Sequence, residues 1–146
     1  MAAWLAQNWF EVFQSAALAG SLLFAGLALR FDARVRRTEV ILSLTEAHRE
    51  IWERLIEQPS LGRILDPSAD AAASPPDAVE RRFVQLVFLH LAAVRQAAWE
   101  GAYRESPGME EDVREFLGLP IPRLVAEEIL PFQTEQFQAY LRELMQ

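Results

Sequence analysis

The chain has 146 residues, no cysteine and a formal net charge of −7 at pH 7. The absence of cysteine excludes a disulfide framework and a thiolate metal site, and it suits a domain in a reducing compartment. This length leaves room for one small globular domain beside any segment that lies in lipid.

An apolar segment lies near the N-terminus. Residues 12–29 carry no formal charge and consist mostly of Ala, Leu, Gly and Phe. As an α-helix they would extend about 27 Å, close to the roughly 30 Å hydrocarbon core of a bilayer. We therefore predict a membrane anchor with its exit over residues 1–37, followed by a cytosolic helical domain over residues 38–146.

Positive charge follows this segment directly. Arg30, Arg34, Arg36 and Arg37 face a single nearby acidic residue, Asp32. The positive-inside rule then places the C-terminal domain in the cytoplasm and the N-terminus outside. We predict that the four arginines determine topology and contact lipid headgroups. A cleaved signal peptide is the competing interpretation, but residues 1–10 hold no Arg or Lys for its basic region.

Small residues recur within the predicted span. Ala17, Ser21 and Ala25 are four residues apart, as are Ala16 and Gly20. Such rows let two membrane helices approach closely, so we predict them as helix-packing surfaces and expect self-association. Because small residues are common in any membrane helix, a plain Ala-rich anchor is the alternative.

The anchor is predicted to continue into a long helix. Neither Gly nor Pro occurs between Gly26 and Pro59, which permits an uninterrupted helix to Gln58. Its second half carries apolar residues at spacings of three and four, which we expect to pack against later helices. These residues are Ile41, Leu44, His48, Ile51 and Leu55, with Val40, Trp52 and Ile56 beside them.

A loop and a second long helix come next. Pro59 ends the first helix, and residues 67–77 are rich in Pro, Ala, Ser and Asp, which predicts a mobile loop. Asp77 and Glu80 form an acidic variant of the capping box, at the start of a helix predicted to reach about Tyr103. Because residues 84–94 are almost entirely apolar, we expect neighbouring helices to cover this helix on several sides.

Three shorter helices are predicted after it. Ser106 and Pro107 are expected to begin the first, and Pro120 and Pro122 to form an extended link after it. The last helix has one apolar stripe, made of Phe137, Tyr140, Leu141 and Leu144. No alternating strand pattern occurs, so the predicted fold is all-α, with one N-terminal transmembrane helix continuing into a small cytosolic helical bundle.

Motifs for chemistry are absent from the sequence. It contains no phosphate-binding glycine loop, no HExxH and no GxSxG, and two histidines without cysteine cannot make the usual structural zinc sites. We therefore predict no catalytic residue, metal or cofactor, and a protein that is not an enzyme. From Thr38 onward the chain has ten arginines and nineteen acidic residues, a net charge of −9, which disfavours nucleic-acid binding.

The two histidines form one candidate pair. His48 and His90 lie on apolar stripes of the two longest predicted helices of the domain. We predict that they approach each other in the core, where protonation of both would place like charges together. Two independent core histidines, each with its own hydrogen-bond partner, are the alternative.

The chain resembles a known group of proteins in several segments. An N-terminal signal anchor, an Arg-rich exit, the segment LTEAHREIWERLIEQPSLGRILDP and the segment LGLPIPR are similar to a widespread group of uncharacterised bacterial single-pass membrane proteins. The chain is also similar, less closely, to small membrane accessory proteins of some CRISPR systems, whose helical domains assemble into ring-like pores. These resemblances imply a bacterial inner-membrane protein with a cytosolic helical domain.

Together these features predict a non-enzymatic single-pass membrane protein that acts through protein contacts. Its expected partners are membrane lipid and either other membrane subunits, in which case it is an accessory or scaffold subunit, or copies of itself. A self-assembling membrane effector or pore is one alternative. A membrane-tethered enzyme without a recognisable motif is the other.

Overall fold

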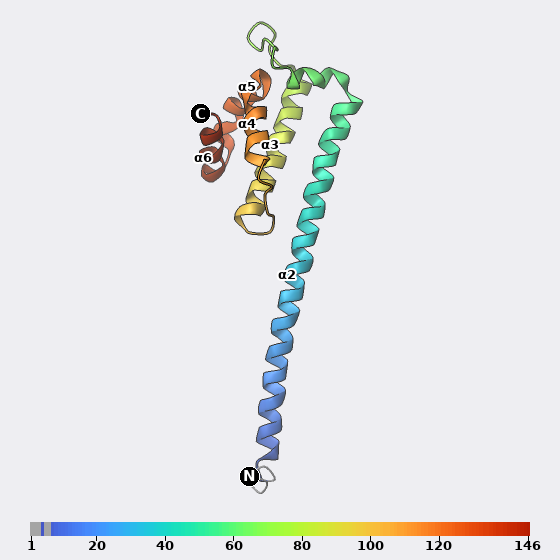
Figure 1. Cartoon of the computed structure of the whole chain (residues 1–146), viewed down its shortest axis with the longest axis vertical. Coiled ribbons are helices and arrows are strands. Elements are labelled where there is room, and N and C mark those ends of the chain that lie inside the picture. The colour runs from blue at the N-terminus through green and yellow to red at the C-terminus, as the bar shows by residue number, and fades with distance from the viewer. Residues whose placement is uncertain (1–3, 5–6) are drawn as a thin grey trace. The chain divides into compact units, whose positions relative to one another are not determined.

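All regular elements of the structure are helices. The structure, a computed structural model, describes residue 4 and residues 7–146, and this part of the chain contains no strand, which confirms the all-α prediction. The remaining residues of the predicted anchor, 1–3 and 5–6, lie outside the described part. The elements shown in Figure 1 are α2 (Trp9–Glu57), η1 (Pro59–Leu65), α3 (Ala78–Trp99), α4 (Met109–Gly118), α5 (Pro120–Ile129), η2 (Leu130–Phe132) and α6 (Glu135–Leu144).

The chain divides into two compact units, Met1–Glu39 and Val40–Gln146. The first unit holds the N-terminal part of α2, including the apolar segment and the four arginines. The second holds the rest of α2 and every later helix. Within it, α3 packs against α5 and η1, and α4 packs against α5 and α6.

Helix α2 runs for 49 residues without interruption, in agreement with the lack of Gly and Pro after Gly26. None of its residues is buried. Ile51 and Leu55 pack partly against the core, whereas Trp52 is 50% exposed and Ile56 is 76% exposed. The predicted packing of the apolar stripe is therefore confirmed for Ile51 and Leu55 and wrong for Trp52 and Ile56, because the stripe is wider than the helix face that contacts the core.

The start of α3 confirms the predicted capping box. The Asp77 carboxylate accepts hydrogen bonds from the backbone N–H of Val79 and Glu80 at 2.7 and 2.8 Å, and the Glu80 carboxylate accepts one from the Asp77 N–H at 2.8 Å. These bonds satisfy N–H groups that lack an intrahelical partner. Glu80 is 5% exposed and also accepts two hydrogen bonds from Arg63.

The end of α3 comes earlier than predicted, at Trp99 instead of about Tyr103. Gly101 has φ = 70°, the left-handed conformation that favours glycine. The Ala102 N–H donates to the Ala97 carbonyl at 2.8 Å and the Gly101 N–H donates to the Ala98 carbonyl at 3.0 Å. This is a Schellman motif, which ends the helix by bonding its last carbonyls.

Two later boundaries also differ from prediction. Helix α4 follows Gly108 as N-cap, not Ser106, and α5 begins at Pro120, where an extended link was predicted. Pro120 and Pro122 fit the first turn of α5 because those positions have no intrahelical acceptor for an N–H group. Their presence therefore starts a helix here.

The core belongs to the second unit and joins η1 to α6. Phe88, Leu117, Ile121 and Leu141 are at most 1% exposed, and the four residues of the predicted α6 stripe are all buried, as expected. Neighbours cover α3 on several sides, as predicted, but they leave Leu89 on this helix 68% exposed.

Candidate functional site

The apolar segment of α2 has no protein cover in the structure. One 18-residue window of α2 has a mean hydropathy of 1.8 and is 0% buried, so α2 is long and apolar enough to cross a membrane by length and composition. Large apolar side chains along it, such as Leu22, Leu23 and Phe24, are 68 to 75% exposed. A soluble protein rarely leaves so much contiguous apolar surface in water.

The small residues of this segment are exposed on the helix surface. Ala17, Ser21 and Ala25 lie on one face, as expected from their spacing of four residues, and Ala16 and Gly20 form the second row. The Ser21 hydroxyl donates to the Ala17 carbonyl at 2.8 Å, so this polar group is satisfied within the helix. A Cβ added at Gly20 would meet nothing within 4 Å.

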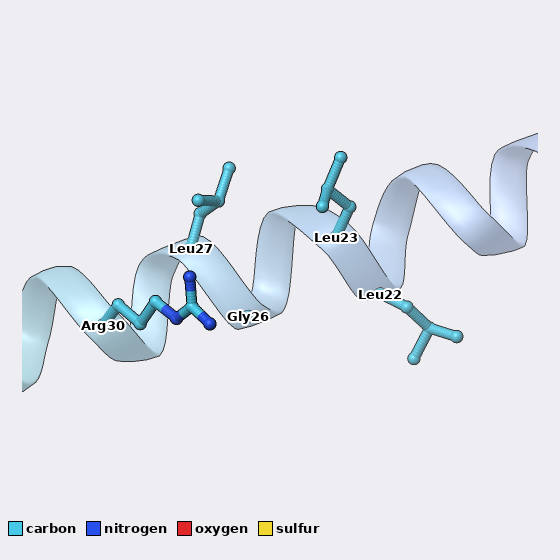
Figure 2. A pocket seen from close by; sticks show the side chains of 5 residues that line it. All are labelled: Leu22, Leu23, Gly26, Leu27 and Arg30. Carbon is cyan, nitrogen blue, oxygen red and sulfur yellow. The ribbon is translucent and has the colours of Figure 1, made fainter.

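A shallow groove lies on α2 next to the arginines. Leu22, Leu23, Gly26, Leu27 and Arg30 line it. Figure 2 shows the leucine side chains projecting on either side of the Gly26 backbone, with the Arg30 side chain extending back along the helix toward Leu27. The groove therefore has apolar walls and a cationic group at its C-terminal end.

The four arginines differ in their partners. Arg36 donates to the Asp32 carboxylate at 2.9 Å. Among the residues that the structure describes, Arg30, Arg34 and Arg37 have no carboxylate within salt-bridge distance. Three of the four predicted headgroup residues thus keep an uncompensated charge.

The structure brings the two histidines of the second unit together. The ring centroids of His48 on α2 and His90 on α3 are 5.5 Å apart. His48 is exposed and His90 half-buried. The predicted burial of the pair is therefore only partial, because no residue of α2 is buried.

The hydrogen bonds of the pair are unequal. The Trp52 indole N–H donates to His48 Nε2 at 3.0 Å, which leaves the proton of neutral His48 on Nδ1. His90 Nδ1 is buried and has no hydrogen-bond partner among the described residues. Burial lowers the pKa of His90, and the charge of His48 lowers it further, so the neutral form of His90 is favoured.

A second polar cluster was missed by the sequence analysis. The Arg95 guanidinium lies over the rings of Tyr140 and Trp99, 4.2 and 5.4 Å from their centroids, and bonds the Glu105 carboxylate. Desolvation alone would lower the pKa of Arg95, but the hydrogen bond and charge of Glu105 outweigh it and raise that pKa. Burial also raises the pKa of Tyr140.

The Arg95 cluster fastens the end of α3 to α6 and to the connection between α3 and α4. Its side chains are largely enclosed, Arg95 being 18% exposed and Glu105 21%. The spacing of Arg95 and Trp99, one helical turn, was a visible signal. The approach of Tyr140 was not, because it depends on the packing of α6.

The domain also carries an exposed apolar patch beside a shallow groove. Phe132 is 85% exposed and Leu89 is 68% exposed. They line the groove together with Gln85, Phe88, Ile129 and Gln133. Sequence analysis missed this patch, because Phe132 stands outside every periodic stripe, in the short turn η2.

The described part of the chain has no cluster of side chains suited to bind a metal ion. Within residue 4 and residues 7–146, no group of three or more His, Asp or Glu side chains could hold a metal ion. The polar clusters described above are built from hydrogen bonds and aromatic contacts.

Comparison with known proteins finds a eukaryotic relative. The chain is similar to "BSD domain-containing protein 1" of Gallus gallus, with 36% identity over 86 residues that represent 55% of this chain. The match spans 19% of the relative, so this chain corresponds to about a fifth of that protein. No protein-family model matches the chain, and no solved structure does.

The comparison corrects the resemblance inferred from the sequence. The assignment to a group of bacterial single-pass membrane proteins with a signal anchor is wrong, because the relative that the chain matches is a eukaryotic BSD domain-containing protein. The segments that suggested the bacterial group are helix caps, turns and packing stripes. Unrelated helical proteins share such features because all of them need the same local geometry.

Proposed function

We propose that this chain is a non-enzymatic single-pass membrane protein whose helical domain acts through protein contacts, as an accessory or scaffold subunit of a membrane assembly. Residues 12–29 cross the bilayer in this proposal, and the arginines after them place the domain in the cytoplasm. The partner is proposed from the surfaces of the chain, because the name of the chicken relative states a domain and not a partner.

The uncovered apolar window of α2 carries the proposal. A long apolar helix inside a soluble protein would be mostly buried, whereas this window is 0% buried. Its exposed surface needs an apolar environment, and a bilayer supplies one around the whole helix.

Membrane insertion can be tested with a matched pair of substitutions. We expect the full chain to remain in the membrane pellet after alkaline carbonate extraction. Phe24→Arg in mid-span should increase the extracted fraction, since an arginine at the bilayer centre costs about 2.5 to 3.5 kcal/mol or more. Leu42→Arg, at a residue that is 58% exposed beyond the arginines, should change nothing. Complete extraction of the unmodified chain would refute the proposal.

The patch around Phe132 supports protein contacts by the domain. An aromatic side chain that is 85% exposed beside an apolar groove is typical of an interface anchor. The test is the native mass in mild detergent, with every copurifying chain identified. We expect a fixed-ratio complex that Phe132→Asp disrupts and that Val79→Asp, at another exposed apolar residue, leaves intact.

Self-assembly is the second candidate function, and the Ala17, Ser21 and Ala25 face favours it. A native mass that is a discrete multiple of 16.6 kDa, without other chains, would support it. In that case Ser21→Leu with Ala25→Leu should dissociate the oligomer, because two bulky side chains would block the close approach. Ala19→Leu, on the opposite side of the helix, is the control. An unchanged mass in the double variant would contradict packing through this face.

A further inference from the structure

The unpaired arginines of α2 share one side of the helix. Arg30, Arg34 and Arg37 are separated by four and then three residues, and at 100° per residue they lie within an arc of about 60°. All three are exposed. The ion pair of Asp32 and Arg36, at 2.9 Å, falls on the opposite side. Between Arg30 and Arg37, ion pairing is therefore confined to one side of α2.

The same side of the helix continues into the groove at Gly26. This groove ends at Arg30, so the first cation of the row is also the last residue of its lining. A Cβ added at Gly26 would meet nothing within 4 Å, which shows that the notch is open to a neighbouring molecule. The apolar groove therefore leads directly to a row of three cations.

An apolar groove that leads to three cations matches an amphiphile with a negatively charged head group. Apolar walls suit an acyl chain, and the planar guanidinium forks suit the oxygens of a phosphate. An inorganic phosphate or a sugar phosphate would use the cations and leave the apolar notch unused. A polyanion such as RNA would also meet the net negative charge of the chain, −7.

We propose that this side of α2 binds an anionic phospholipid, with an acyl chain in the notch at Gly26 and the phosphate on Arg30, Arg34 and Arg37. The inference rests on the proposed function, since it requires residues 12–29 to lie in a bilayer. It goes further by assigning a lipid class and by separating these three arginines from Arg36.

The test is native mass spectrometry of the full chain in detergent, titrated with phosphatidylglycerol or with phosphatidylcholine of the same acyl chains. We expect phosphatidylglycerol to bind more tightly. Arg34→Gln should weaken its binding about fivefold, which corresponds to about 1 kcal/mol per basic residue at an anionic surface. Arg36→Gln removes the same charge only two residues along the helix, about 3 Å in height, but on the opposite side, and should leave the affinity unchanged.

The groove at Gly26 can be tested with a second matched pair of substitutions. Gly26→Leu fills the groove and should weaken both lipids, because their acyl chains are identical. Ala28→Leu places the same side chain at a small residue on the opposite side of α2, outside the groove, and should weaken neither.

Other outcomes overturn the proposal in distinguishable ways. Equal binding of the two lipids, or equal effects of Arg34→Gln and Arg36→Gln, would refute it. Full competition by soluble glycerol 3-phosphate would identify a phosphate site, and competition by a short RNA would identify a nucleic-acid site. If carbonate extracts the chain from vesicles, the proposed function fails; if the chain is inserted but shows no lipid preference, this inference alone fails.

Discussion

At the scale of single residues, Glu80 is a buried acid that holds several segments of the domain together. It is 5% exposed, accepts two hydrogen bonds from Arg63 at 2.9 and 3.1 Å, and closes the capping box of α3. Arg63 also donates to the Ser74 carbonyl, inside the loop over residues 67–77. One carboxylate thus joins η1, the loop and α3, although the mobility of that loop stays a prediction.

We expect Glu80→Ala to lower the free energy of unfolding by about 2 to 3 kcal/mol, because it removes the carboxylate partner of Arg63 and the acceptor of the Asp77 N–H. Chemical denaturation followed by circular dichroism would measure the change. Glu53→Ala is the control, since Glu53 forms an exposed pair with Arg49 at 3.3 Å and should cost less than about 1 kcal/mol. Equal costs for the two variants would contradict the role assigned to Glu80.

The histidine pair predicts a pH dependence of a definite sign. The pKa of His90 is lowered by burial and by His48, so its folded value lies below the unfolded value of about 6.5. The stability is therefore complete above that unfolded value and falls as the pH drops toward the folded pKa.

Chemical denaturation of the full chain between pH 5 and 8 would measure this effect. We expect the free energy of unfolding to fall below about pH 6.5, and His90→Gln to remove that fall, because the lowered pKa belongs to His90. His48→Gln should only weaken the fall, because the burial of His90 remains. A free energy of unfolding that is flat over this range in the unmodified chain would show that the pair does not respond to pH.

At the scale of elements, helix ends decide where the chain turns. Gly101 adopts φ = 70° in the Schellman motif that ends α3, while Gly118 is the last residue of α4 with no such constraint. A Cβ would meet nothing within 4 Å at either glycine, so any difference between them comes from the backbone alone.

Gly101→Ala should therefore destabilise the domain by about 1 to 2 kcal/mol, the cost of a left-handed alanine. Gly118→Ala should be neutral or stabilise it by up to about 1 kcal/mol, because alanine is the better helix former. Thermal unfolding of both variants under identical conditions measures the contrast. If both shift in the same direction, backbone conformation is not the cause.

The elements also show what sequence could predict. The long helix α2, the capping box at Asp77 and the stripe of α6 follow from local rules, and the structure has all three. The start of α5 at Pro120 was not predicted, because a proline can either end a helix or occupy the first turn of one. The site needed more than local rules: the Arg95 contact with Tyr140 and the exposure of Phe132 depend on how distant segments pack.

At the scale of the whole molecule, the two units differ in whether buried side chains stabilise them. The core cluster lies within the second unit, and α2 contributes to it only the partly buried Ile51 and Leu55. The first unit contains no buried side chain among its described residues. Folding of the domain should thus depend on residues after Glu39, and membrane attachment on residues before Val40.

We therefore expect a fragment of residues 40–146 to fold by itself, because it retains the whole core cluster. It should unfold cooperatively on heating and stay in the supernatant after high-speed centrifugation, whereas the full chain should require detergent. The control is the fragment with Leu117→Asp, at a core residue that is 1% exposed, which should abolish the cooperative transition. A fragment that folds but still sediments with membranes would show that the helical domain itself contains the membrane-attachment site. An unfolded fragment would show that the domain depends on residues 1–39, against the division into two units.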